Sequence, residues 1–156
     1  MEFKTPQPLK VEHEELHEEL VKATKAGGKI GAAAKAVAKL LHPHFLKEED
    51  YAAPPLGLLV PLAEGKVTPE MQDVLVMTEK LKAELREMLQ EHKAIVAALK
   101  KLAAVAKKEP KRGYERFAEK LILHAQTEEQ VLYPAAILIG EYLKVTLHKQ
   151  GAAAVS

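Results

Sequence analysis

Two stretches of this sequence carry one polar pattern: HFLKEE at residues 44–49 and HAQTEE at residues 124–129. In each stretch a histidine is followed four residues later by two consecutive glutamates, and the two copies lie 80 residues apart. Residues four apart share one face of an α-helix. Each stretch therefore predicts a helix that directs one imidazole and one carboxylate into the same volume.

The repeat extends to the helices that precede these stretches. Glu12-His13 recurs as Glu91-His92, at an offset of 79 residues, and apolar positions recur around it. The further matching pairs are Leu16 with Ile95, Leu20 with Leu99, Leu41 with Leu121 and Pro54 with Pro134. Two helical hairpins with the same polar pattern can stack about a pseudo-twofold axis. The sequence therefore predicts an all-α fold, an up-and-down four-helix bundle made of two pseudo-repeated hairpins.

Apolar stripes at helical spacing mark the expected helices. They predict four long helices over about residues 6–26, 31–53, 69–107 and 114–133. Pro43 lies inside the second helix and predicts a kink or bulge just before His44, because proline lacks the N–H that a helix interior uses. The inward stripe of the fourth helix includes Val131.

Two segments lie outside the repeat. Residues 54–67 are read as a long, apolar, irregular loop, and Pro134 opens a short apolar fifth helix that reaches about His148. We expect these segments to cover one end or side of the bundle, or to form a homodimer through residues 55–83 and the C-terminal helix. At 156 residues the chain is expected to be a single domain, residues 1–156.

Composition narrows the function classes. The chain has 23 Lys and Arg against 22 Asp and Glu, so no basic excess favours nucleic acid or an anionic membrane. No apolar run approaches the ~18 residues of a membrane span, and the first residues lack the apolar stretch of a secretory signal. Cysteine is absent, which excludes disulfides, iron–sulfur clusters and thiol catalysis. We therefore expect a cytoplasmic protein.

Six polar residues fall on the inward stripes of the expected helices. They are His13, His44, Glu48, His92, His124 and Glu128. Buried imidazoles and carboxylates need partners, and four converging helices would bring all six to a common centre. Two divalent ions satisfy such a set, with Glu48 and Glu128 bridging and the histidines capping. The adjacent residues Glu12, Glu49, Glu91 and Glu129 are candidate hydrogen-bond partners of the imidazoles.

A single H-x-x-x-E pair is weak evidence, because about one is expected by chance in a chain this rich in glutamate. The coincidence of six such residues in a repeat favours a metal site. A metal-free interaction module would need six buried polar groups to satisfy one another. A ferritin-like carboxylate site uses E-x-x-H with mostly glutamate ligands, a spacing that this sequence lacks.

These residues resemble the hemerythrin-like, or HHE cation-binding, family. The matching pieces are Glu12-His13, residues 42–49, Glu91-His92 and residues 124–134, and the resemblance covers about residues 9–54 and 84–134. It implies an up-and-down four-helix bundle around a non-haem di-iron centre. In that family two iron ions are bridged by two carboxylates and an oxo or hydroxo group.

One departure from the oxygen carriers of that family bears on function. Those proteins have an H-x-x-x-H pair on the third helix, whereas Met88 and Val96 stand four residues from His92 here. An H-x-x-x-H does occur on the first helix as His13 and His17. His17 is therefore either a seventh ligand, or a residue that is solvated or supports the ligands from outside. Fewer histidines leave more open coordination positions, which favours activation of an oxidant over reversible oxygen carriage.

The resemblance implies a di-iron protein that binds, senses or reduces O2, NO or peroxide, with weak peroxidase- or oxidase-type activity as one outcome. The alternative is an iron-binding or regulatory module whose metal is structural and turns nothing over. Zinc or manganese could replace iron on the same ligands. Tyr51 and Tyr133 lie near the proposed ligands, where they either pack or hydrogen-bond to a bound oxygen species. His42 is expected on the surface, and no residue is assigned a catalytic role.

Overall fold

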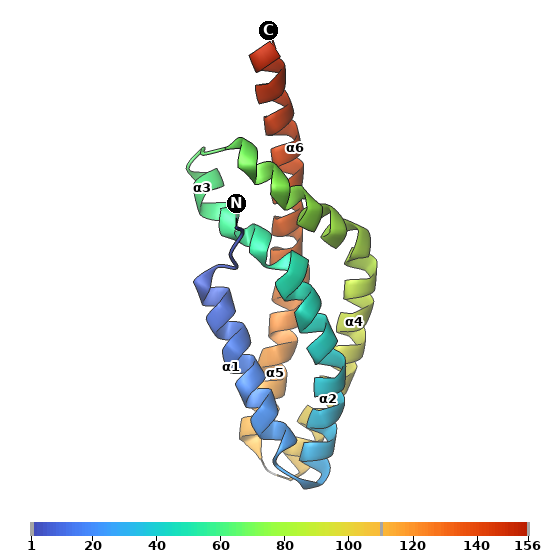
Figure 1. Cartoon of the computed structure of the whole chain (residues 1–156). Helices are drawn as coiled ribbons and strands as arrows, with labels where there is room; N and C mark the ends of the chain where they lie inside the picture. The colour runs from blue at the N-terminus through green and yellow to red at the C-terminus, as the bar shows by residue number, and fades with distance from the viewer. Residues whose placement is uncertain (1, 110, 156) are drawn as a thin grey trace.

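Four long helices lie side by side in the computed structural model, which describes residues 2–109 and 111–155 (Figure 1). They are α1 (Gln7–Thr24), α2 (Gly28–Lys47), α4 (Leu75–Lys108) and α5 (Arg112–Thr127). Helices α1 and α5 pack against each other, as do α1 and α2, α2 and α4, and α4 and α5, and each such pair runs in opposite directions. This closed set of antiparallel neighbours is the arrangement of an up-and-down four-helix bundle, and the described residues contain no strand.

A π-helical turn follows α2 and α5 at the same point of the two repeats. The turns are η1 (Glu48–Ala52) and η4 (Glu128–Leu132), and each begins at the glutamate of the H-x-x-x-E motif. In η1 the Ala53 N–H donates to the carbonyl of Glu48 at 2.8 Å, five residues back. Such turns occur mostly as single insertions within α-helices and are frequent at functional sites.

The bulge expected just before His44 is therefore in a different place. Helix α2 stays α-helical through Pro43, and the irregular turn begins only at Glu48. Pro43 lies on the exposed side of α2, where water can replace the hydrogen bond that proline cannot donate.

Part of the loop predicted at residues 54–67 is helical rather than irregular, because it contains the 3₁₀ turn η2 (Pro54–Leu58) and the short helix α3 (Leu59–Ala63). The next helical stretch begins at Pro69, as predicted, with the 3₁₀ turn η3 (Pro69–Val74) ahead of α4. In the segment between α2 and α4, the apolar residues Leu56, Leu58, Met71 and Val74 are buried against the chain itself. Packing within the chain thus explains why this segment is rich in apolar residues. The homodimer through residues 55–83 and the C-terminal helix stays a prediction.

Helix α6 (Tyr133–Val155) is longer than the short fifth helix expected from Pro134. It continues the line of α5 and projects beyond the other helices in Figure 1. Pro134 does not interrupt the continuous helical line of α5, η4 and α6. It is the second residue of α6, and proline is tolerated in the first turn of a helix. No helix in the described part of the chain is long and apolar enough to cross a membrane.

The buried apolar residues form two clusters, one toward each end of the molecule. The first cluster lies at the end of the bundle where α1 connects to α2 and α4 connects to α5. It includes Leu20, Leu99 and Phe117. The other joins η1, η2 and η3 to α4 and α6, and includes Leu81 and Leu143. The six predicted polar residues occupy the positions between these clusters along the helices. They form a polar layer across an otherwise apolar core.

Close packing of α6 on α4 depends on Gly140. A Cβ at this position would lie 2.3 Å from Oγ1 and 2.7 Å from Cβ of the buried Thr78. We expect Gly140→Ala to push the helices apart and to lower the free energy of unfolding by about 1–3 kcal/mol, seen as a lower melting temperature. Gly113→Ala is the matched control, because a Cβ there meets nothing within 4 Å. Equal melting temperatures for the two variants would contradict this close approach.

Candidate metal centre

The structure brings all six predicted polar side chains together. They form two groups of four, His13, Glu48, His124 and Glu128, and His44, Glu48, His92 and Glu128, with the donor atoms of each group within 4.8 Å of one another. Both glutamates belong to both groups. Each group could hold a cation, and each has two imidazoles of its own and the two shared carboxylates.

The helices position these side chains through local spacing. Glu48 lies one turn after His44, and its Oε1 is 2.6 Å from the imidazole Nε2. The corresponding distance between Glu128 Oε2 and His124 Nε2 is 3.5 Å. His13 and His92 arrive from α1 and α4 on the opposite sides of the bundle. Their Nε2 atoms lie 3.1 Å from that of His124 and 2.8 Å from that of His44, respectively.

The set is withdrawn from water. His44, Glu48 and His92 are each 1% exposed, and His124 and Glu128 are nearly as buried. Burying so many titratable groups is costly unless they are paired. Within the described residues every buried side-chain nitrogen or oxygen has a hydrogen-bond partner. Converging imidazole nitrogens beside two carboxylates are a donor set suited to cations such as Fe, Zn or Mn ions.

Three further glutamates hold the imidazoles from behind. Glu91 Oε2 lies 2.9 Å from Nδ1 of His44, and Glu129 Oε1 lies 3.0 Å from Nδ1 of His92. Glu12 contacts Nδ1 of His124. A carboxylate on Nδ1 fixes the tautomer in which the Nε2 lone pair faces the centre. The sequence predicted this role for all three.

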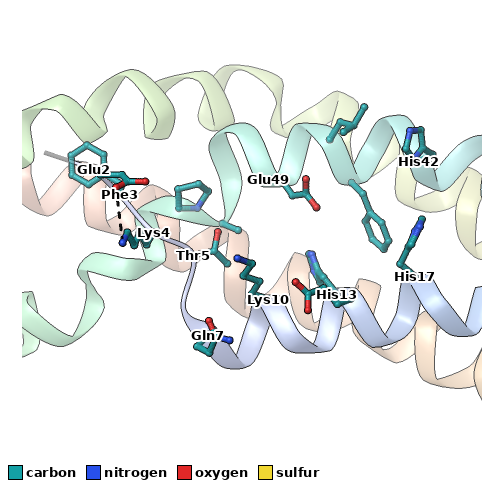
Figure 2. A pocket seen from close by; sticks show the side chains of 15 residues that line it. Glu2, Phe3, Lys4, Thr5, Gln7, Lys10, His13, His17, His42 and Glu49 are labelled. Carbon is teal, nitrogen blue, oxygen red and sulfur yellow. Dashed lines mark ion pairs between the residues drawn. The ribbon is translucent and has the colours of Figure 1, made fainter.

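The fourth predicted partner, Glu49, is exposed and makes no hydrogen bond to an imidazole in the described part of the chain. It lies across from His13 at the edge of a groove (Figure 2). The pseudo-symmetry of the outer glutamates is therefore broken at His13, which is also the most exposed of the four imidazoles, at 11% of its side chain.

The buried imidazoles and carboxylates shift one another's pKa values. Burial alone would lower the pKa of His92, but hydrogen bonds to Glu128 and Glu48 outweigh it and raise that pKa to about 10. The pKa of His124 is raised to about 9 in the same way, by its hydrogen bond to Glu128. Burial and the charge of Glu48 raise the pKa of Glu128 to about 7. Hydrogen bonds from Glu128, His44 and His92 overcome burial and hold the pKa of Glu48 well below its usual range.

Tyr133 reaches the centre, a contact that the sequence left open. This residue directly follows η4 and is buried, and its hydroxyl donates to Glu48 Oε1 at 3.0 Å. The same oxygen lies 3.1 Å from Nε2 of both His44 and His92. Burial and the charges of Glu48 and Glu128 raise the pKa of Tyr133 well above its ordinary value. Tyr51 points elsewhere, toward Glu84 and to within 3.6 Å of the Met88 sulfur.

A groove of about 920 Å³ leads from solvent to His13 (Figure 2). The N-terminal segment, α1 and α2 line it, and the ring of Phe45 stacks on His13 with centroids 5.1 Å apart. His17 and His42 are exposed in this groove and belong to neither group of four. His17 thus stands in the position of a solvated residue, and His42 is on the surface as predicted.

Comparison with known families gives one match. The family model described as the hemerythrin HHE cation-binding domain matches residues 7–136, from the start of α1 to the first turn of α6. No curated protein and no solved structure gives a significant match.

We expect cation affinity to rise with pH. The pKa values of His92 and His124, raised to about 10 and 9, and of Glu128, raised to about 7, mean that an ion must displace protons from these groups. Lower pH therefore favours the competing protons. Calorimetric titration of the apoprotein with zinc, a redox-inert probe, should show tighter binding from pH 6 to pH 9. Heats that differ between buffers of different ionisation enthalpy would report the proton release, and pH-independent affinity would contradict the protonated cluster.

Proposed function

The chain belongs to the hemerythrin HHE cation-binding domain family, and from this we propose that it is a non-haem di-iron protein that binds, senses or reduces a small oxidant, namely O2, NO or peroxide. The observation that carries the proposal is the pair of overlapping groups in which Glu48 and Glu128 are shared. Shared carboxylates next to separate imidazole pairs suit two adjacent ions better than one.

The donor chemistry supports iron. Four imidazoles and two carboxylates are the ligand types of non-haem iron sites, although zinc or manganese would also accept them. Glu12, Glu91 and Glu129 orient three of the imidazoles and raise their basicity, which strengthens binding of a divalent ion. Bound iron would supply the redox chemistry.

The surroundings support a small reactant. Apolar clusters on both sides of the polar layer exclude bulk water from the centre. A cavity of about 10 Å³ touches His13, Glu48 and Glu128, which is close to the least volume that holds one water molecule. A space this small favours a reactant of few atoms over a larger organic substrate.

The second candidate function is an iron-binding or regulatory module in which the metal is structural. The observation that favours it is the position of the centre, because its ligands come from all four helices of the bundle. Ions there would tie the bundle together, since the free energy of metal binding adds to that of folding. The two functions differ in whether the centre reacts with an oxidant.

We expect protein produced with iron to hold about two irons per chain, by analogy with paired-metal sites. His124→Ala should lose about one of them and should melt at a lower temperature, because one ion position loses half of its imidazoles. His148→Ala is the control, since His148 is exposed on α6, and it should match the wild type in both measurements. Metal analysis and thermal unfolding check this, and unchanged iron content in His124→Ala would overturn the ligand assignment.

The same iron-loaded protein separates the two functions. Ferric absorption that bleaches on anaerobic reduction and returns within seconds of adding air or peroxide supports reaction with an oxidant. Bound iron whose absorption does not respond to air or peroxide supports the structural module. So does a centre that binds zinc alone.

A further inference from the structure

Among the positions where the two repeats differ, one places a side-chain oxygen directly beside the donor atoms of the centre. The pseudo-twofold exchanges His13 with His92 and His44 with His124, so it also exchanges the two ion positions. Glu48 and Glu128 open equivalent π turns, and the residue five places after each is Ala53 in one repeat and Tyr133 in the other. The two ion positions thus have equivalent imidazoles and carboxylates but different neighbours after the turn.

On the His44–His92 side, the Tyr133 oxygen has the spacing of a ligand atom. It lies 3.0 Å from Glu48 Oε1 and 3.1 Å from Nε2 of each of the two histidines. An ion with ligand distances of about 2.1 Å in octahedral geometry places neighbouring ligand atoms about 3.0 Å apart. A tyrosine that only filled space would not need its oxygen equally close to three donor atoms of one ion position.

On the His13–His124 side, the alanine leaves space. Ala53 and Tyr133 both line the cavity of about 10 Å³ beside Glu48 and Glu128, and of the four imidazoles it is His13 that lines it. Ala53 and His13 also line the groove of about 920 Å³ that opens to solvent, in which Figure 2 shows His13 between α1 and α2. Of the two ion positions, this one is therefore next to both free volume and an entry route.

We propose that Tyr133 is a further ligand of the ion held by His44 and His92, and that the ion held by His13 and His124 keeps the open position at which a small exogenous molecule binds beside Ala53. Coordination of the tyrosine oxygen releases its proton to solvent, as binding does for other ligands that must be deprotonated. The inference rests on the proposed di-metal function and adds to it which ion takes the reactant.

Tyrosine ligation has a spectroscopic signature that is independent of turnover. A tyrosine oxygen on a ferric ion gives a visible charge-transfer band, and resonance Raman excitation in that band enhances tyrosine ring vibrations. We expect both in the oxidised, iron-loaded wild type and in Tyr51→Phe, whose hydroxyl contacts Glu84 instead of the centre. In Tyr133→Phe the band should be lost while most of the iron is retained.

Ring-deuterated tyrosine provides a second measurement on the wild type, so the test does not depend on folding of Tyr133→Phe. The enhanced vibrations should shift with the label. Iron-loaded wild type without a tyrosine band, or a band unchanged in Tyr133→Phe, would overturn this inference and leave the di-iron proposal standing. A wild type that takes up no iron would overturn both.

The open position is tested by filling the space beside Ala53. Azide is the probe, and its binding to the ferric protein is followed by the change in absorption. Ala53→Leu should weaken azide binding about tenfold or more, because a larger side chain must displace its neighbours before azide can enter. Tyr133→Phe should still bind azide, since the open position lies at the other ion.

Ala38→Leu is the matched control, since Ala38 lines a hollow that adjoins the groove at His17 and His42 but is lined by neither Ala53 nor any of the six proposed ligands. It should bind azide as the wild type does. Iron content equal to that of the wild type would show that the centre assembles in each variant, and Ala53→Val is the smaller change to use if Ala53→Leu does not fold. Azide affinity in the Ala53 variants equal to that of the wild type would overturn the assignment of the open side.

Discussion

Two carboxylates that are buried against each other are the constraint on which the rest of this structure depends. Glu48 and Glu128 share both groups of donor atoms, and like charges this close cannot both be ionised without a compensating positive charge. The raised pKa values of His92 and His124 favour protonated imidazoles beside these carboxylates. Cations can replace the protons, and every helix of the bundle contributes a group that they would bind.

This polar layer sets the architecture around it. Because the two glutamates must face inward on helices whose other inward residues are apolar, the core is divided into a cluster on each side of the layer. The π turns begin at these same glutamates and let the following residues approach the centre. The segment from η2 to η3 and helix α6 then contribute to the second apolar cluster, the one that includes Leu81 and Leu143. The apolar residues between α2 and α4 are therefore buried against the chain itself.

Much of this could be predicted from the sequence because the decisive signals are local. Residues spaced by four give the H-x-x-x-E faces, and the glutamates that hold the imidazoles sit beside ligand positions in sequence. The π turns leave no such signal, and one extra residue rotates all that follows by about 100°. For this reason Val131, which the helical stripe placed inward, is 56% exposed. Pro134 was expected to open a short fifth helix that reaches about His148, whereas α6 begins at Tyr133 and runs to Val155.

The sequence repeat pairs Ala53 with Tyr133, but only the structure shows that each residue directly follows a π turn beside the centre. A strict repeat would make two equivalent ions, each equally open or equally closed. A centre that admits one small molecule at a defined ion must break that symmetry. One difference is sufficient, at the position five residues after each shared glutamate. A buried tyrosine is tolerated there because Glu48, His44 and His92 are all hydrogen-bond partners of its hydroxyl. The asymmetry thus costs the fold little and leaves the four histidines and two glutamates of the centre in place.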